Sequence, residues 1–519
     1  MSSLFAPPIL TCAETLAFEK ELLGDDEAKE WPAMQAAGRA VAAGVLDDFQ
    51  EIGGFPADGR ILVLAGKGHN AGDALLATQA LLEKFPAARA TVIFAFGDQG
   101  LRPLTVRAWR ELVHFASDRV SVGRAGGSAF AGLRRDEPPA SPDAYDLCLG
   151  GVFGFQFRPP LDAATAKLLA WANALPVRLR AAVDLPSGLG EPDAFRADFT
   201  YATGTVKTPL LALPNAGRVR YLDLGFFSAS RAPCQLIVDK TGGDRLLTDA
   251  VLEPLRRLRS PQTDKRTYGH LLVLGGSRSF PGAVLMSVLA ALRGGTGLVT
   301  AMVPESLVAA YAARAPEAMW VGWPETAAGG MALEGLALWR THIERATAAV
   351  IGPGLVREPE TLTLVREIVK ITAQPMVLDA DALQPTIVRA GKSPRVLTPH
   401  AGEFQRIAPG GEPRAFAAEI GATVVRKGPV TQVTDGRTTW HSFFGGPVLA
   451  RGGSGDVLAG LIGGQLAQTP DDLPGAAARG VVWHGRAADL LARAHGQVAV
   501  TTTQLLDFLP EVLRETGRP

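Results

Sequence analysis

The chain has 519 residues, more than one hydrophobic core holds, so we expect roughly two to four domains. With 47% hydrophobic and 20% charged residues, its composition is that of a soluble globular protein. The 52 basic and 52 acidic residues cancel, which argues against a nucleic acid or an anionic membrane held by bulk charge.

The start of the chain and its cysteines bear on the cellular compartment. Residues 1–20 place no basic residue ahead of their apolar ones and contain Pro7 and Pro8, which argues against a signal peptide. No apolar run reaches the roughly 18 residues that cross a bilayer. Three cysteines without metal-ligand spacing, Cys12, Cys148 and Cys234, predict reduced thiols. We therefore expect a cytoplasmic protein with no membrane partner.

The first half alternates strands with helices. A helical pattern over residues 33–49 precedes a strand at 60–65, and a glycine loop at 66–73 leads into a helix that runs through Leu82. Further strands are expected at 90–96, 147–149 and 179–183. This alternation predicts a doubly wound parallel sheet, in which working residues lie at the carboxyl ends of strands. Four polar residues meet that condition: Asn70, Asp73, Asp184 and Ser187.

Weak periodicity over residues 226–263 separates the halves, and we place the boundary near residue 230, giving domains of residues 1–230 and 231–519. The second half is again α/β. Its apolar strands each end in a glycine or polar cluster, and the expected segments are 269–277, a helix from 282 to 293, and strands at 297–303, 350–354, 376–383, 396–403 and 423–428. The halves share no repeat, which indicates two different α/β domains.

The stretch at 450–460 is the most informative. Gly452, Gly453 and Gly455 would let backbone N–H groups approach phosphate oxygens without a Cβ in the way. The apolar run from Val457 predicts a helix that starts at Asp456 and turns its positive end toward those phosphates. Asp456 could then take a proton from a hydroxyl beside a nucleotide. A strand-to-helix turn with a capping Asp would give the same letters, so the rest of the chain must decide.

Six motifs occur in one order: Gly-Gly-Ser (275–277), Ile-Gly-Pro-Gly (351–354), Leu-Asp-Ala-Asp-Ala-Leu (378–383), Leu-Thr-Pro-His-Ala-Gly-Glu-Phe (397–404), Lys-Gly-Pro-Val-Thr (427–431) and Gly-Gly-Ser-Gly-Asp-Val-Leu-Ala-Gly (452–460). Together they resemble the ADP/ATP-dependent NAD(P)H-hydrate dehydratase family, a ribokinase-like branch. The first half is similar to its usual fusion partner, NAD(P)H-hydrate epimerase. The resemblance covers nearly the whole chain and implies a Rossmann-like N-terminal domain and a ribokinase-like C-terminal one.

For the second half, the resemblance implies that the terminal phosphate of ADP or ATP, with Mg²⁺, activates the ring hydroxyl of hydrated NADH or NADPH. Asp456 would be the catalytic base of this phosphoryl transfer. Residues implied to bind nucleotide are Lys427, Gly428, Pro429, Val430, Thr431 and Gly455; those implied to hold the hydrated dinucleotide are Ala283, Gly354 and His400. Asp379 and Asp381 either cap turns or order metal or water.

For the first half, the resemblance implies that Asp184 is the acid/base and that Asn70 and Ser187 help bind K⁺. The implied substrate-binding residues are His69, Asn70, Ala71, Gly72, Asp73, Gly154 and Arg158. The family's Asn-Asn-Gly-Gly-Asp-Gly loop is altered here at His69, Ala71 and Ala74. Gly150 stands where the family has a K⁺-ligating Asp, which should weaken the site because hard cations need oxygen ligands. Water or Asp146 could substitute, although we expect Asp146 to end its own turn.

Three functions compete: a repair enzyme with both activities, a ribokinase-like kinase of a small hydroxylated molecule, and a dehydratase whose first half is a binding module without catalysis. The Thr-Pro-His-Ala-Gly-Glu stretch at 398–403 favours the dehydratase branch over the sugar and vitamin kinases. We expect a homo-oligomer. The choice between ADP and ATP, and between NADH and NADPH hydrate, stays open.

Overall fold

The computed structural model describes residues 6–24, 26–124, 145–227 and 243–515. The chain divides into two compact units, an N-terminal unit of residues 7–242 and a C-terminal unit of residues 243–518 with residues 1–6. Each is described by itself. The boundary expected near residue 230, like Cys234, lies outside the described residues.

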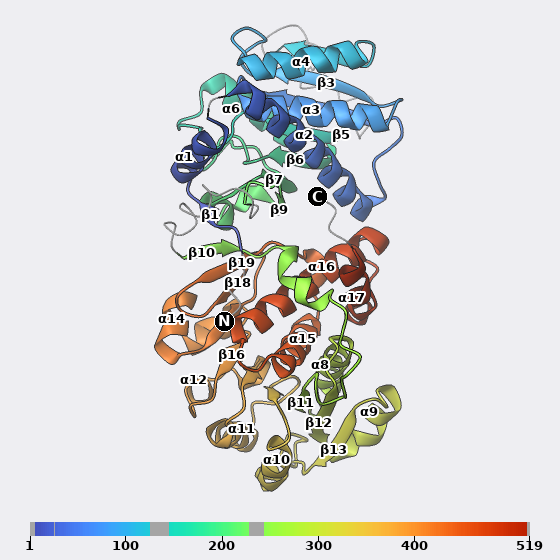
Figure 1. Cartoon of the computed structure of the whole chain (residues 1–519), viewed down its shortest axis with the longest axis vertical. Coiled ribbons are helices and arrows are strands. Elements are labelled where there is room, and N and C mark those ends of the chain that lie inside the picture. Colours follow the sequence, from blue (N-terminus) through green and yellow to red (C-terminus); the bar gives the residue numbers. More distant parts are fainter. Residues whose placement is uncertain (1–5, 25, 125–144, 228–242, 516–519) are drawn as a thin grey trace. The chain divides into compact units, whose positions relative to one another are not determined.

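The N-terminal unit, coloured blue to green in Figure 1, contains a seven-stranded sheet in the order β4-β3-β2-β5-β6-β7-β9, and every pairing in it is parallel. Its strands are β2 (Arg60–Ala65), β3 (Arg89–Phe94), β4 (Val120–Arg124), β5 (Tyr145–Gly151), β6 (Val177–Val183), β7 (Phe199–Thr203) and β9 (Arg218–Leu222). A separate pair joins β1 (Ile9–Leu10) to β8 (Val206–Lys207). The helices are α1 (Cys12–Leu23), α2 (Glu27–Phe49), α3 (His69–Lys84), α4 (Pro103–Ala116) and α6 (Ala163–Ala174).

Helices cover both faces of this sheet because successive strand residues point to opposite sides. On β2, Ile61 and Val63 pack into the core under α2, α3 and α4, whereas Leu62 and Leu64 pack under α6. All four are fully buried. Continuous apolar strands of this kind are typical of parallel sheets covered on both faces, as the sequence predicts.

The C-terminal unit, coloured green to red in Figure 1, contains a ten-stranded sheet in the order β10-β19-β18-β17-β16-β15-β14-β11-β12-β13. Only β18 pairs antiparallel, with β17 and β19. Its strands are β10 (Asp244–Leu246), β11 (His270–Leu274), β12 (Leu298–Pro304), β13 (Met319–Trp323), β14 (Ala348–Ile351), β15 (Met376–Leu378), β16 (Arg395–Leu397), β17 (Thr423–Arg426), β18 (Thr431–Thr434) and β19 (Thr439–Ser442).

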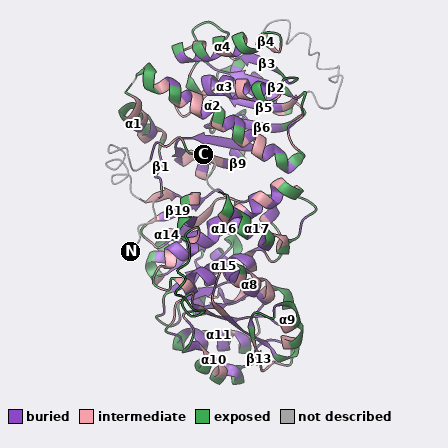
Figure 2. Ribbon diagram, turned by 45° about the vertical axis from the view of Figure 1, so that its right-hand side comes forward, coloured by how far each residue is buried: buried purple, intermediate pink, exposed green. Residues whose placement is uncertain are grey.

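Two helix layers enclose this sheet. One core packs beneath α8 (Pro281–Arg293), α9 (Val308–Arg314), α15 (Ser454–Gln468), α16 (Leu473–His495) and α17 (Leu505–Arg514). The other packs beneath α10 (Leu336–Ile343), α11 (Pro359–Ile371), α12 (Pro385–Val388), α13 (Ala401–Ile407) and α14 (Pro413–Ile420). Figure 2 shows the buried strands of each unit in purple and the outward sides of helices in green. The expected α/β class is confirmed.

Two helices begin earlier than the sequence predicts. Helix α3 starts at His69, so most of the expected loop at 66–73 is its first turn. Helix α15 starts at Ser454 rather than at Asp456, because Gly453, with φ of 88°, completes the turn before it. Asp456 is therefore the third residue of the helix. In both places the turn is tighter than the motif suggests.

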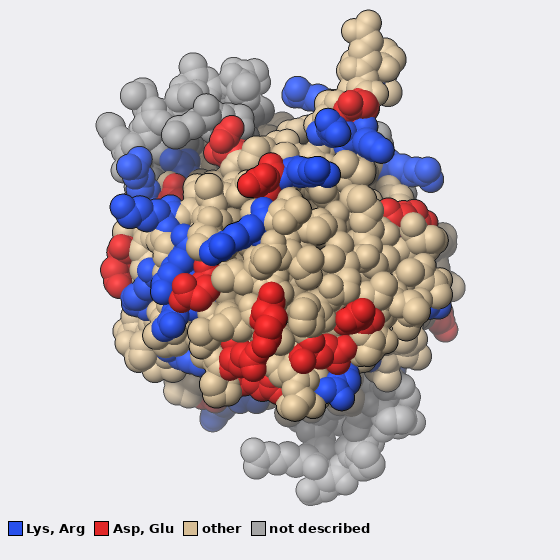
Figure 3. Space-filling model, turned by 90° about the horizontal axis from the view of Figure 1, so that it is seen from below, with Lys and Arg blue, Asp and Glu red and all other residues tan. Residues whose placement is uncertain are grey.

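Surface charge and hydropathy agree with the composition. On the face drawn in Figure 3, Lys and Arg side chains are interspersed with Asp and Glu side chains, and uncharged surface lies between these groups. Among the described residues, no helix combines the length and the apolar character that a bilayer span requires. Cys12 and Cys148 are free thiols.

Candidate active sites

In the C-terminal unit, Asp456 lies in the first turn of α15. The hydroxyl of Ser287 donates to the Asp456 carbonyl at 2.8 Å and ties this turn to α8. Oγ of Ser454 lies 3.4 Å from Nε2 of His484. Burial lowers the pKa of His484 to about 4. The N–H groups of a first turn have no partner within the helix and can bind anions. The turn thus offers backbone donors and a carboxyl group together.

The carboxyl group of Asp456 has a pKa raised to about 7. Burial contributes most, and the charges of Asp379 and Glu403 add to it, while Lys427 opposes them. A group with this pKa both accepts and releases a proton near neutral pH, which general-base catalysis requires.

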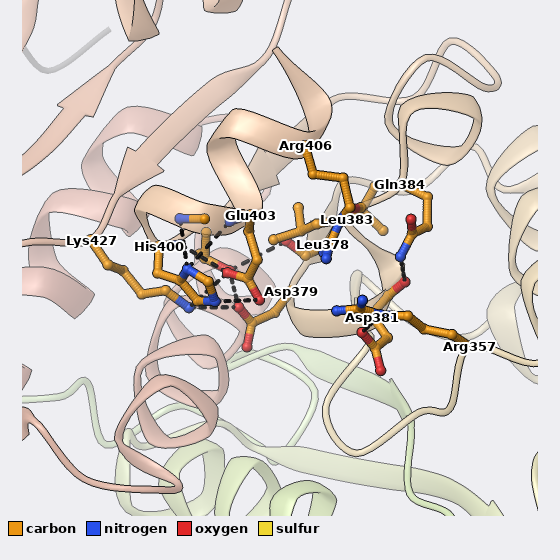
Figure 4. Close-up of polar contacts among 12 residues, drawn as sticks. Arg357, Leu378, Asp379, Asp381, Leu383, Gln384, His400, Glu403, Arg406 and Lys427 are labelled. Carbon is orange, nitrogen blue, oxygen red and sulfur yellow. Dashed lines mark hydrogen bonds and ion pairs between the residues drawn. The ribbon is translucent and has the colours of Figure 1, made fainter. Parts of the chain in front are cut away.

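Lys427 follows β17 and lies among carboxylates (Figure 4). Its Nζ is 3.0 Å from Oδ1 of Asp379 and 3.8 Å from Oε2 of Glu403. Asp379 also accepts a hydrogen bond from the hydroxyl of Thr398 at 2.7 Å. The backbone N–H of Lys427 donates to the carbonyl of Pro399 at 2.9 Å. Both polar groups of Lys427 are therefore engaged within the protein.

The rest of the expected nucleotide loop is accessible. Gly428, Pro429 and Val430 connect antiparallel β17 and β18; Gly428 and Pro429 are exposed and Val430 is half-buried. Thr431 bonds the Gly428 carbonyl at 3.2 Å. A Cβ at Gly428 would have only the Val430 carbonyl oxygen, at 3.8 Å, within 4 Å. This hairpin loop can accept a ligand without rearranging the core.

His400 caps a helix and also presents part of its ring to solvent. Its Nδ1 accepts from the N–H groups of Gly402 and Glu403 at 3.0 and 3.3 Å, so it caps α13. Its side chain is nevertheless 60% exposed. The helix cap fixes the ring while the edge that carries Nε2 stays open to solvent and to Glu403.

The structure also brings Ala283 and Gly354 together. A Cβ at Gly354 would lie 3.1 Å from that of Ala283, and Gly354 has φ of 71°. Both reasons require glycine there. The hydroxyl of Ser277 donates to the Gly354 carbonyl at 2.8 Å. The Gly-Gly-Ser and Ile-Gly-Pro-Gly motifs thus meet at the ends of β11 and β14.

Asp379 and Asp381 were expected either to cap turns or to order metal or water. Both carboxylates are ion-paired, Asp379 with Lys427 at 3.0 Å and Asp381 with Arg357 at 2.7 Å. Among the residues that the structure describes, no group of three or more His, Cys, Asp or Glu side chains is arranged to hold a metal ion.

In the N-terminal unit, Asp184 directly follows β6 in a strained conformation, with φ of 63°. A non-glycine residue held there is often functional. Asp184 is 4% exposed and forms a buried ion pair with Lys207, which is itself 1% exposed. The hydroxyl of Thr203 lies 3.4 Å from Oδ1 of Asp184. The surrounding fold therefore fixes this carboxylate in place.

Asn70 and Ser187 meet at Phe153. The Asn70 amide donates to the carbonyls of Phe153 and Val183 at 2.9 and 2.8 Å. The Ser187 hydroxyl accepts from the Phe153 N–H at 2.9 Å and lies 3.2 Å from its carbonyl. A Cβ at Gly154 would lie 3.3 Å from Oδ1 of Asn70. Asn70 and Ser187 thus both contact Phe153, and Asn70 also contacts Val183, the residue before Asp184.

The remaining substrate-loop residues differ in environment. Asp73 is buried, and burial together with the charges of Asp184 and Glu19 raises its pKa well above the usual value. Burial lowers the pKa of His69. A Cβ at Gly72 would lie 2.6 Å from the Met34 sulfur, whereas Ala71 is already fully buried. Arg158 is exposed on the loop after β5.

The expectation for Asp146 is wrong. Asp146 is the second residue of β5, where it accepts from the Arg60 N–H at 2.9 Å and pairs with Arg178 at 3.4 Å. It ends no turn. Four residue-to-residue steps of extended strand, roughly 13 Å at 3.3 Å each, separate it from Gly150. Asp146 therefore supplies no ligand at the other end of the strand.

Sequence reasoning missed the partners of both carboxyl groups. Lys207 is the one charged residue between positions 199 and 217, and a lone lysine in such an apolar run signals a buried ion pair. Glu19 of α1 has a pKa raised to about 7 by burial and the charge of Asp184, against Lys207. No local pattern links it to Asp184. The contact of Lys427 with Asp379 and Glu403 likewise joins three separate motifs.

Comparisons with known proteins cover both units. Residues 32–209 match the family model described as YjeF-related protein N-terminus, and residues 271–511 match that of NAD(P)H-hydrate dehydratase. The solved ADP/ATP-dependent NAD(P)H-hydrate dehydratase of Bacillus subtilis, co-crystallised with ATP and Mg²⁺, is 29% identical; the match covers 52% of this chain and 97% of that one, with a TM-score of 0.45.

Full-length relatives show the same combination. The bifunctional NAD(P)H-hydrate repair enzyme Nnr of Gloeobacter violaceus is 35% identical over 98% of this chain and 99% of its own length. That of Moorella thermoacetica is 33% identical over 93% of this chain and 92% of its own length. The family resemblance found in the motifs is confirmed, and the chain belongs to the bifunctional NAD(P)H-hydrate repair enzymes.

Proposed function

We propose that this chain restores hydrated NADH and NADPH by two reactions: epimerisation of the R and S hydrates, and dehydration of the S hydrate at the expense of ADP or ATP. We assign epimerisation to residues 1–230 and dehydration to residues 231–519. The observation that carries the proposal is that relatives with this name match end to end, while each unit holds a carboxyl group at its family motif, the buried Asp184 or the half-buried Asp456.

In the dehydratase reaction, Asp456 takes the proton of the ring hydroxyl. The hydroxyl oxygen attacks the terminal phosphorus of the nucleotide at the same time. The bond from phosphorus to the rest of the nucleotide breaks, and the ring carries a phosphate ester. That phosphate then leaves, with loss of a ring proton, and the double bond of NAD(P)H returns. The first-turn N–H groups of α15 would bind phosphate charge, so positioning and electrostatics dominate catalysis.

The two ligands need separate surfaces. We propose that the exposed hairpin loop, with Gly428, Pro429, Val430 and Thr431, binds the nucleotide together with Gly455 and the backbone of Lys427. The hydrated dinucleotide would lie against Ala283, Gly354 and His400. Contact between Ala283 and Gly354, and the open Nε2 edge of His400, support this assignment.

In the epimerase unit, we propose that Asp184 acts as acid and base at the hydroxyl-bearing ring carbon. Its fixed backbone and its ion pair with Lys207 support that role. The residues at the start of α3 (His69, Asn70, Ala71, Gly72 and Asp73), with Gly154 and Arg158, would bind the dinucleotide.

Two metal ions are part of the proposal. Mg²⁺ usually binds through one or two carboxylates and the nucleotide's own phosphates, so a preformed protein cage is not needed. K⁺ would be held by neutral oxygens of Asn70, Ser187 and the nearby carbonyls. These residues would bind a monovalent cation through neutral oxygens alone, because position 150 is a glycine and supplies no carboxylate.

The test is to incubate the protein separately with purified R and S hydrates, with and without ADP or ATP, and to follow the return of NAD(P)H absorbance. We expect rapid conversion of both hydrates only with nucleotide. Fast clearance of S alone would show a first half without catalysis. A phosphorylated product without NAD(P)H would show a kinase. A cytoplasmic homo-oligomer stays a prediction, which light scattering and fractionation would check.

A further inference from the structure

The side chain of Lys427 is mostly buried. Its sequence motif predicts that it binds phosphate, yet its ammonium group already contacts carboxylates of the protein. Its ammonium group is committed to Asp379 at 3.0 Å and reaches Glu403 at 3.8 Å, from the ends of β15 and from α13 (Figure 4). Its backbone N–H is committed to Pro399. These two carboxylates therefore fix the position of the ammonium.

The same ammonium lies against the first turn of α15. A Cβ at Gly455 would be 3.2 Å from Nζ of Lys427, so the absence of a side chain there lets the charge approach. Asp456 is the next residue. A cation at a helix N-terminus is unfavourable, because that end of the helix dipole is positive. The carboxylates of Asp379 and Glu403 contact the ammonium, and the charge of Asp456 also favours it.

We propose that Lys427 is a positioning residue for Asp456: its ammonium, held in place by Asp379 and Glu403, keeps Asp456 ionised in a buried site. The inference rests on the proposed function of Asp456 as the base. It separates the ammonium of Lys427 from the hairpin loop, whose backbone and other residues bind the nucleotide. The catalytic carboxylate then depends on charges from β15, α13 and the end of β17.

The charged groups facing Asp456 come from several elements. Asp379 and Glu403 disfavour a third negative charge, and Lys427 favours it. On α16, His484 is neutral near pH 7, because its pKa is about 4, so it adds no charge there. Burial opposes the charge on Lys427, but Asp379, Glu403 and Asp456 outweigh it and raise the pKa of Lys427. Lys427 therefore stays cationic across the pH range in which Asp456 titrates.

The sign of the effect follows. A base works only when ionised, so dehydration falls as pH drops through the pKa of Asp456, about 7. Removing the charge of Lys427 raises that pKa further. An opposite charge at this range shifts a carboxyl pKa by roughly 1–3 units. A shift of one unit lowers kcat/KM at pH 7 about fivefold, because the ionised fraction falls from about a half to about a tenth.

The experiment measures kcat/KM for the S hydrate against pH, and nucleotide affinity by calorimetry, in Lys427→Met. We expect the acidic limb to move up by about one unit or more and nucleotide Kd to change less than about twofold. Lys427→Arg should keep the limb near its original position. Arg426→Met removes the neighbouring cation, which takes no part in these ion pairs, and should change neither quantity.

Asp379→Asn tests the same network with the opposite sign, because losing a negative charge should move the limb to lower pH. This variant decides the matter if Lys427→Met fails to fold. An unmoved limb in both variants, or a limb unmoved in Lys427→Met with nucleotide Kd raised tenfold, would overturn the inference. Titration of the Asp456 carboxyl carbon by ¹³C NMR, assigned with Asp456→Asn, gives the same shifts without turnover. It therefore tests the network even if the wild-type protein proves inactive as a dehydratase.

Discussion

In the N-terminal unit the buried ammonium of Lys207 contacts Asp184 itself, whereas in the C-terminal unit that of Lys427 contacts Asp379 and Glu403 and lies beside the turn that carries Asp456. One carboxylate has a dedicated counterion, and the other shares a counterion with two competitors. The difference suits the two reactions. Asp456 must take a proton from a hydroxyl as phosphoryl transfer proceeds, so a pKa near 7 serves it.

The two sites also differ in which carboxyl groups have a raised pKa. Around Asp184, burial raises the pKa of two neighbouring acids, Asp73 and Glu19, above their usual values. Around Asp456, the raised pKa belongs to the proposed base itself and to Glu403, where burial is again the largest cause. Burial is thus the largest cause of the raised pKa at each of these four carboxyl groups.

The largest effect on activity is expected from a substitution of Asp456. We expect Asp456→Asn to lower dehydration of the S hydrate by about 10²–10⁴, the usual contribution of a general base. Nucleotide Kd should stay within about twofold, since the first-turn N–H groups of α15 remain. Stopped-flow absorbance and calorimetry measure the two quantities, with Asp381→Asn, which loses only its pairing with Arg357, as the matched control. Turnover like that of the wild type would remove Asp456 from the mechanism.

The next largest effect should be confined to the other unit. Asp184→Ala should reduce R-to-S conversion by about 10² or more, while the S hydrate is still dehydrated at the normal rate. Mixed hydrates would then clear rapidly only in their S fraction. The variant also leaves Lys207 buried without its partner, which is costly, so thermal unfolding must be measured alongside. If both fractions clear quickly in the folded variant, Asp184 does not carry epimerisation.

The sequence alone predicts the α/β class, most strand positions and the residues at strand ends. Asn70, Asp184 and Ser187 lie together because parallel strands end at one edge, which makes their meeting predictable. Lys207 and Glu19 reach the same place from β8 and α1, and their pairing depends on the three-dimensional path of the chain.

Contacts between distant parts of the chain position two side chains in ways that the motifs do not show. Asp146 reads as a turn residue, but Arg60 and Arg178 hold it inside β5. Lys427 matches a nucleotide-binding motif, yet its side chain is directed by Asp379, which lies 48 residues away in sequence. Long-range ion pairs of this kind leave no periodicity to detect.

Gly455 gives a smaller but sharper test of the C-terminal site. We expect Gly455→Val to weaken nucleotide binding by roughly tenfold, about 1.4 kcal/mol, because its side chain would crowd both the phosphate and Nζ of Lys427, only 3.2 Å from the Cβ position. Gly452→Ala tests a second glycine of the same motif and should weaken binding less, since nothing lies within 4 Å of a Cβ there. Equal ADP affinity in Gly455→Val and the parent, by calorimetry, would place the phosphate site elsewhere.

The smallest expected change in activity concerns K⁺ at Gly150. A Cβ there would lie 2.8 Å from two carbons of the buried Phe195 ring, so this ring fills the space that a carboxylate would need. Gly150→Asp alone should therefore lower the free energy of unfolding by about 1–3 kcal/mol, as overpacking does, and leave the K⁺ dependence of epimerisation unchanged.

Gly150→Asp combined with Phe195→Ala opens the space, and we expect epimerase activity to saturate at lower K⁺ than in Phe195→Ala alone. Urea unfolding and K⁺ titration of R-to-S conversion measure both effects. A Gly150→Asp protein as stable as the parent, with a sharper K⁺ response, would show that Phe195 yields readily and that Gly150 alone limits the cation site.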